Sequence, residues 1–354
     1  MITMEDLLVL MVRKDGSDLH ISAGSPPRIR VDGTLVPVDT PELTPEDTRR
    51  LATSVLTQEQ IATLEREFEL DCSFELADQG RFRANVFFQR GSVACVLRLV
   101  PHGLLSFDQL GLPLDVCERL CNLRSGLVLV CGSTGSGKST TLASMIDFIN
   151  QNRQGHIVTI EDPIEFAHKS NSCLVTQREI GGDSKKFGNA LRSVLRQDPD
   201  IVLVGELRDL ETIEAALTLA ETGHLTFGTL HTNDAVQTIN RIIDVFPSHQ
   251  QAQILTQLSF TLEGVFCQQL LPKAEGRGRC LAAEVLLASP AVRALIREGK
   301  SHQIYSQMQT GGRQGMRTMT ASLAELVRSG QVRVQDAEAS LSDPGEFLRL
   351  VRAA

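Results

Sequence analysis

The chain lacks the segments that would mark it as a membrane or secreted protein. No window of its 354 residues is apolar for long enough to span a bilayer, and no internal repeat or low-complexity segment is present. Acidic residues stand at positions 5 and 6, where a secretory signal would carry basic residues. We therefore expect a cytoplasmic protein.

Paired cysteines are also absent. The chain contains no C-x-x-C pair, which argues against a zinc site or a disulfide framework. Cys117 and Cys121 have helical spacing, but no second pair of ligands lies near them in the sequence. We expect reduced cysteines that serve as small hydrophobic residues. They are Cys72, Cys95, Cys117, Cys121, Cys131, Cys173, Cys267 and Cys280.

An excess of positive charge is missing as well. The formal net charge is −8 at pH 7, which argues against a broad nucleic-acid surface and leaves room only for a local basic channel. No direct nucleic-acid partner is expected. Hydrophobic residues make up 42% of the chain and charged residues 22%, an ordinary composition for a soluble protein long enough for two domains.

What the chain does contain is a phosphate-loop pattern. Residues 132–140 match G-x-x-x-x-G-K-[ST] at every fixed position, after a predicted buried strand at 127–130 and before a predicted helix at 140–149. The glycines let backbone N–H groups converge on phosphate, and the helix N-terminus adds positive potential. The pattern predicts an ATP or GTP site built from Gly132, Ser133, Thr134, Gly135, Ser136, Gly137, Lys138, Ser139 and Thr140.

Individual roles follow for three residues. Lys138 is expected to reach the β- and γ-phosphates, and Ser139 is expected to ligate Mg²⁺. Glu206 follows the apolar run 201–204 after one glycine. A second acid that binds Mg²⁺, directly or through water, usually stands at such a place.

Further polar groups follow other predicted strands. Strands are predicted at 157–160, 201–204 and 225–230 besides 127–130, with helices between them, so the sheet should be mainly parallel. Ligands of such sheets lie at the carboxyl ends of the strands. The three carboxylates of 161–165 are expected to orient or deprotonate the attacking water, or to favour the dipole of a following helix.

Two histidines bracket the last of these strands. His224 precedes the strand at 225–230 and His231 follows it. We expect them to sense the γ-phosphate or to link two subunits, and their spacing does not indicate a metal site.

The region before residue 100 predicts a separate α/β domain. Its helix is expected at 4–13, followed by strands that begin at 18, 28, 81 and 92, with a turn at Asp32 and Gly33. Thr44 and Asp47 signal a second helix start. Domains are thus expected at 1–100 and 115–354, with a linker at 101–114. Beyond residue 250 helices are expected, for example at 289–298 and 319–329.

Together these segments resemble the secretion ATPase superfamily, and within it the PilT-type retraction ATPases of type IV pili. The resemblance is carried by residues 132–140 (Walker A), 159–166 (Asp box), 195–206 (Walker B) and 222–234 (His box), in that order and spacing. It implies an N-terminal PAS-like domain joined to a RecA-like phosphate-loop ATPase domain, in a homo-hexameric ring that binds ATP between subunits.

The resemblance also implies residue roles. Glu165 matches the catalytic glutamate, Glu206 the Walker B acid, and His224 and His231 the His-box histidines. Arginines of the N-terminal domain reach the nucleotide in this family, and the best matches are Arg83 and Arg98. The implied activity is ATP hydrolysis that drives pilus retraction and twitching motility, at the cytoplasmic face of the inner membrane, on a membrane platform protein.

Two features separate the branches of the superfamily. The paired C-x-x-C element of pilus-extension and type II secretion ATPases is missing, whereas residues 291–298 resemble the A-I-R-N-L-I-R-E helix of retraction ATPases. Where the motif of retraction ATPases carries asparagine, this chain has Ala294. This difference leaves a PilU-type accessory ATPase as a second interpretation. The motifs also leave open a type II secretion or DNA-transfer ATPase and a regulatory module that hardly hydrolyses ATP.

Overall fold

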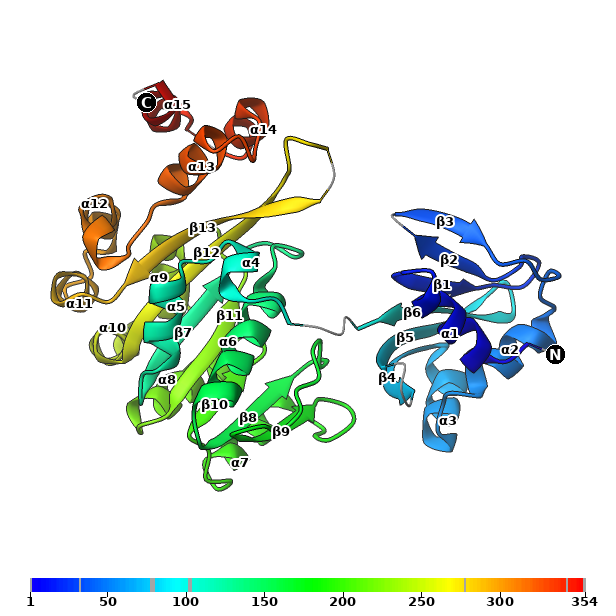
Figure 1. Cartoon of the computed structure of the whole chain (residues 1–354). Helices are drawn as coiled ribbons and strands as arrows, with labels where there is room; N and C mark the ends of the chain where they lie inside the picture. The colour runs from blue at the N-terminus through cyan, green and yellow to red at the C-terminus, as the bar shows by residue number, and fades with distance from the viewer. Residues whose placement is uncertain are drawn as a thin grey trace. The chain divides into compact units, whose positions relative to one another are not determined.

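The computed structural model describes residues 2–31, 33–76, 80–100, 104–276, 278–341 and 343–352. The chain divides into two compact units (Figure 1). The N-terminal unit is Met1–Gly103 with Glu165–Ala167, and the C-terminal unit is Leu104–Ile164 with His168–Ala354. The predicted turn residue Asp32 and the predicted linker start at 101–103 lie outside the described residues.

An antiparallel sheet forms the centre of the N-terminal unit. Its strand order is β3-β2-β1-β6-β5-β4. The strands are β1 (Asp18–Ile21), β2 (Arg28–Val31), β3 (Thr34–Pro37), β4 (Glu69–Leu76), β5 (Gly80–Gln89) and β6 (Ser92–Leu99). The helices of this unit are α1 (Met4–Arg13), α2 (Pro45–Thr53) and α3 (Gln58–Glu67).

Local sequence signals explain these elements. Thr44 caps α2 by accepting the N–H of Asp47, and the Asp47 carboxylate accepts the N–H of Thr44 in return, which is the predicted helix start. Along β5 buried and less buried residues alternate, so that Phe82 and Ala84 face the core. The predicted helix at 4–13 is confirmed, and Leu7, Leu8 and Met11 of α1 are fully buried.

The C-terminal unit is built on a second sheet, in the order β13-β12-β7-β11-β10-β8-β9. The strands are β7 (Gly126–Cys131), β8 (His156–Glu161), β9 (Leu174–Glu179), β10 (Ile201–Val204), β11 (Leu225–Leu230), β12 (Leu262–Pro272) and β13 (Arg279–Leu287). Neighbours from β12 to β9 pair in parallel, and β13 runs antiparallel to β12. The four predicted strands are confirmed as β7, β8, β10 and β11, and the sheet is mainly parallel as expected.

Helices accompany this sheet along the rest of the chain. They are α4 (Phe107–Leu110), α5 (Leu114–Cys121), α6 (Lys138–Asn152), α7 (Phe187–Val194), α8 (Leu210–Glu221), α9 (Ala235–Asp244), α10 (Ser248–Thr261), α11 (Pro290–Arg297), α12 (Ile304–Thr310), α13 (Met319–Arg328), α14 (Val334–Ala339) and α15 (Gly345–Arg352), with 3₁₀ turns η1 (Ser301–Gln303) and η2 (Gly311–Gln314). None of the described helices combines the length and apolar character needed to cross a membrane.

Beyond residue 250, the helices expected at 289–298 and 319–329 are confirmed as α11 and α13, but the expectation of helices throughout this region is wrong. β12 and β13 pair over nine residues there and extend the sheet next to β7 (Figure 1). Most residues of both strands are buried, including the polar residues Gln268 and Glu284, so neither sequence shows the alternation of apolar and polar residues that is typical of a half-buried strand. Periodicity alone cannot distinguish such a segment from a buried helix, which is why the hairpin was not predicted.

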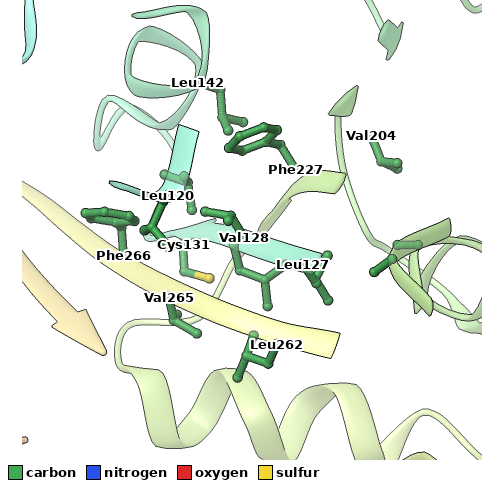
Figure 2. Close-up of a cluster of buried hydrophobic side chains, with 14 of the residues drawn as sticks. Leu120, Leu127, Val128, Cys131, Leu142, Val204, Phe227, Leu262, Val265 and Phe266 are labelled. Atoms are coloured by element: carbon green, nitrogen blue, oxygen red, sulfur yellow. The ribbon is translucent and has the colours of Figure 1, made fainter. Parts of the chain in front are cut away.

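The core of the C-terminal unit gathers around the central strands. Every residue of β7 and β11 is buried. Figure 2 shows Phe227 of β11 beside Leu142 of α6, while Val265 and Phe266 of β12 lie near the β7 side chains. Phe107 and Leu112 join this core, although both fall in the stretch expected to be a linker.

The cysteines behave as small hydrophobic residues. All eight are free, and six of them are buried. Burial raises the pKa of the Cys95 and Cys117 thiols to about 12, so both are neutral at physiological pH.

A candidate nucleotide site at the carboxyl edge of the sheet

Four polar segments follow four neighbouring parallel strands. The phosphate loop follows β7, His231 follows β11, Glu206 follows β10 by one residue, and Glu161 ends β8. These strands lie side by side in the order β7-β11-β10-β8. Because parallel strands place their carboxyl ends at one edge, the four segments line the same edge of the sheet.

The phosphate loop has the backbone that its glycines predict. Gly132, Gly135 and Gly137 have φ angles of 139°, 79° and 94°. Gly137 stands at the N-cap of α6, where it has no side chain to cap the first N–H groups of the helix. Those N–H groups and the helix dipole suit an anion at the loop.

Lys138 is held over the loop by two carbonyl groups. Its Nζ donates to the carbonyl oxygens of Gly132 at 2.7 Å and Ser133 at 3.0 Å, and the residue is only 9% exposed. Ser136 Oγ is buried and has no hydrogen-bond partner among the described residues. A confined lysine, an orphan hydroxyl and an uncapped helix N-terminus together fit a bound phosphate chain.

Glu206 lies in a small cluster of charged residues. Its Oε2 accepts from Arg208 Nη2 at 2.7 Å, and its Oε1 lies 3.3 Å from His231 Nε2. The hydrogen bond to Glu206 raises the pKa of Arg208. Thr229 Oγ1 donates to the carbonyl oxygen of Gly205 at 2.6 Å and so ties the residue before Glu206 to β11.

The sequence motifs did not predict a role for Arg208 at this site. A cation two residues after the predicted Mg²⁺-directed acid was the available signal.

The carboxylates of residues 161–165 belong to different units of the chain. Glu161 Oε1 accepts from Thr159 Oγ1 at 2.6 Å and from Gln177 Nε2 at 3.1 Å, within the C-terminal sheet. Glu165 groups with the N-terminal unit, and there Arg83 Nη1 donates to Glu165 Oε1 at 3.0 Å. No helix begins in this segment, so its acids do not serve a helix dipole.

Arg98, the other predicted arginine, is paired inside the N-terminal unit. Its Nε donates to Asp18 Oδ1 at 2.8 Å. Burial works to raise the pKa of Asp18, but hydrogen bonds from the Ser17 hydroxyl and from Arg98 outweigh it and lower that pKa.

The two histidines are not brought together. His231 lies at the phosphate-loop edge, whereas His224 precedes β11 at the opposite edge, where its carbonyl accepts the N–H of Gly126. The six residues of β11 lie between them, which places their Cα atoms about 23 Å apart at ~3.3 Å per residue. His224 Nδ1 lies 3.0 Å from the Leu219 carbonyl and 3.1 Å from Thr222 Oγ1.

Comparison with known proteins decides the family. The model of the family described as "Type II/IV secretion system protein" matches residues 2–339, nearly the whole chain. The chain belongs to this family. The candidate site described above thus lies on the scaffold of this family.

Individual relatives agree with that assignment. The chain is 47% identical to the Pseudomonas aeruginosa protein "Type IV pilus retractation ATPase PilT" over 342 residues, covering 97% of this chain and 99% of the relative. It is 42% identical to "Type IV pilus ATPase PilU" of the same organism over 347 residues, covering 98% and 90%. The resemblance to PilT-type ATPases predicted from the motifs is confirmed.

A solved structure confirms the predicted fold class. The structure described as "Crystal Structure of the Pilus Retraction Motor PilT and Bound ADP" matches with a TM-score of 0.93 and 50% identity, covering 99% of this chain and 100% of that one. The fold is thus the predicted α/β type, with a RecA-like domain and a smaller N-terminal domain.

The oxygen donors of this secretion ATPase fit Mg²⁺ bound with a nucleotide. Among the described residues no three His, Cys, Asp or Glu side chains are grouped closely enough to hold a metal by themselves. Mg²⁺ usually keeps several waters and binds through one or two protein ligands plus substrate phosphates. A hydroxyl at Ser139, the second residue of α6, and a carboxylate at Glu206 supply that kind of donor set.

The two histidines of this family member should differ in effect. We expect His231→Gln to lower ATP turnover about tenfold, since it weakens a contact to a charged group at the phosphate edge. His224→Gln should leave turnover per assembled site within about twofold, because His224 lies at the far edge. Steady-state ATPase assays over a range of protein concentrations check this, and equal losses in both variants would contradict it.

Proposed function

We propose that this chain is a hexameric motor ATPase that hydrolyses ATP to drive type IV pilus retraction and twitching motility. The observation that carries the proposal is the shared sheet edge, which holds Lys138 of the phosphate loop, Glu206 and His231 on adjacent parallel strands. The near full-length similarity to a protein named as a retraction ATPase supports pilus retraction as the work that the motor performs.

In this proposal the phosphate loop binds ATP. The loop N–H groups and the N-terminus of α6 cradle the phosphates, and Lys138 reaches the β- and γ-phosphates. Ser139 and Glu206 would hold Mg²⁺, which neutralises developing charge on the phosphates when bound. His231 keeps Glu206 oriented through their 3.3 Å contact.

The remaining roles belong to Glu165, to arginines of the N-terminal domain and to the contacts between subunits. Glu165 orients or deprotonates the attacking water, and Arg83 and Arg98 act on the nucleotide of a neighbouring subunit. His224 contributes to the contact between subunits. The N-terminal domain ends near residue 100, and the ATPase domain, which begins at Leu104 because Phe107 and Leu112 belong to its core, rotates during the cycle.

The proposed partners follow from pilus retraction as the work that the motor performs. The ring would work at the cytoplasmic face of the inner membrane, on a pilus platform protein, and a paralogous retraction ATPase would assist it. Nucleic acid is not among the expected partners, since the net charge is −8.

The decisive experiment is imaging of fluorescent pili in a strain that lacks this gene. We expect retraction to return with the wild-type gene and not with Glu165→Gln, a change that keeps the size of the side chain and removes its charge. Normal retraction in the deletion strain, combined with a defect in protein secretion or DNA transfer, would overturn the proposal in favour of those loads.

An accessory ATPase of the PilU type is the second candidate. It is favoured by the 42% identity to PilU over 98% of the chain and by Ala294 in α11, where the retraction motif carries asparagine. Arg293 of α11 keeps a structural role, donating to Glu263 and to the carbonyls of Ser259 and Phe260. Retraction by this protein as the cell's only such ATPase would exclude the accessory role.

A further inference from the structure

Outside the phosphate site, Glu284 is a carboxylate buried in the sheet. It lies on β13 and is 3% exposed. Its Oε1 accepts the backbone N–H of Ala235 at 2.8 Å, and its Oε2 accepts the backbone N–H of Met319 at 3.1 Å. The two oxygens of one side chain thus bind segments that are far apart in the sequence.

Both donors are the first residues of helices. Ala235 begins α9 and Met319 begins α13. First-turn N–H groups have no partner within their own helix, and a carboxylate at that place is favourable for the helix dipole. Burial raises the pKa of Glu284, and the two N–H donors oppose that rise.

On one side, Glu284 holds the turn that carries His231. Ala235 follows directly on the residues 231–234, and His231 contacts Glu206. Thr238 of α9 stiffens the turn, because its Oγ1 donates to the Asp234 carbonyl at 2.8 Å and lies 2.6 Å from Thr232 Oγ1. Glu206, His231 and the start of α9 are thus linked through one short turn.

On the other side, Glu284 holds the start of α13. That segment is bound to β13 at neighbouring points, where Ala283 donates its N–H to Ser322 Oγ at 3.1 Å and Val285 pairs with Arg317. Leu323 and Ala324 of α13 share a small core with Phe347 of α15. The last helices of the chain thus connect to β13 through α13.

We propose that Glu284 is a positioning residue that couples the His231 turn to α13, so that the nucleotide state at the phosphate edge reaches helices α13 to α15. The carboxylate joins two helix starts that are far apart in the sequence, and a displacement of one changes the hydrogen bond of the other. This coupling rests on the proposed function, since it requires nucleotide at the phosphate loop. It makes the C-terminal helices responsive to the state of the ATPase site.

The chain offers a matched pair of variants for the α13 link. Met319→Pro removes the N–H that Glu284 accepts, at the first helical position, where proline is favoured. Thr318 before it is already extended, with φ −78° and ψ 157°, as a residue preceding proline requires. Met319→Ala removes the same side chain but keeps the N–H. Glu284→Gln is the second variant, which can accept only one of the two N–H groups.

The test is hydrogen exchange of the full chain, measured by mass spectrometry with ADP and with a non-hydrolysable ATP analogue plus Mg²⁺. We expect the wild type and Met319→Ala to change exchange at 231–237 and at 317–328 when the analogue replaces ADP. In Met319→Pro and Glu284→Gln the change at 231–237 should persist, while that at 317–328 should shrink at least threefold.

Binding of the analogue is measured in the same samples. An equal response at 317–328 in Met319→Pro and Met319→Ala, or bound analogue with no response there in the wild type, overturns the coupling and leaves the proposed function standing. No binding by the wild type overturns both. If Met319→Pro does not fold, as judged from its thermal unfolding, the Glu284→Gln result decides alone.

Discussion

Lys138→Ala should lower steady-state ATP turnover by at least about 100-fold. Its ammonium group is held between the carbonyls of Gly132 and Ser133, where it faces the expected β- and γ-phosphates. Removing one preorganised charge that stabilises a transition state typically costs 10²–10³-fold in turnover. Alanine is a good helix former, so α6 should remain intact and the loss should be chemical.

The measurement is phosphate release by the purified protein with ATP and Mg²⁺. Lys14→Ala is the matched control, since Lys14 is an exposed lysine at the end of α1 in the N-terminal unit, and it should retain wild-type turnover. A Lys138→Ala protein that keeps its turnover would remove this residue, and with it the phosphate loop, from the assigned role.

Gly132→Ala should cost about 100-fold in nucleotide affinity. The φ of Gly132 is 139°, and an added Cβ would lie 2.5 Å from both the Gln268 carbonyl oxygen and Ser136 Oγ. The carbonyl belongs to β12 and cannot swing away as a flexible side chain would. Backbone strain of this kind costs about 1–3 kcal/mol, and ~2.8 kcal/mol corresponds to roughly 100-fold in affinity.

The measurement is a titration with a fluorescent ADP analogue, combined with thermal unfolding. Gly111→Ala is the matched control, because Gly111 also has a positive φ of 75° but has no atom within 4 Å of an added Cβ. It should lose only stability and keep its affinity. Equal affinity in Gly132→Ala and the wild type would show that the loop tolerates a side chain at its first glycine.

Several features of this protein could be predicted from short stretches of sequence. The phosphate loop, the capped start of α2 and the buried strands β10 and β11 were found at their observed places. Each depends on residues that are neighbours in the chain: glycines that permit positive φ, a threonine followed three residues later by an acid, and apolar runs between polar ends. Local physics is enough for such elements.

Other features depend on packing between distant segments. The sequence does not predict the β12–β13 hairpin, because its mostly buried strands lack the alternation of apolar and polar residues that is typical of a half-buried strand. The contact of His231 with Glu206 requires β10 and β11 to lie side by side, which no single motif predicts.

The sequence by itself determined that a phosphate-loop pattern lies between a buried strand and a helix and that acids follow other strands of a parallel sheet. Only the tertiary structure decided that His231 meets Glu206 while His224 lies at the opposite edge, and that Glu284 joins the starts of α9 and α13. The physical reason is that neighbours in the chain set the backbone conformation, whereas strand order and burial set these contacts between distant residues.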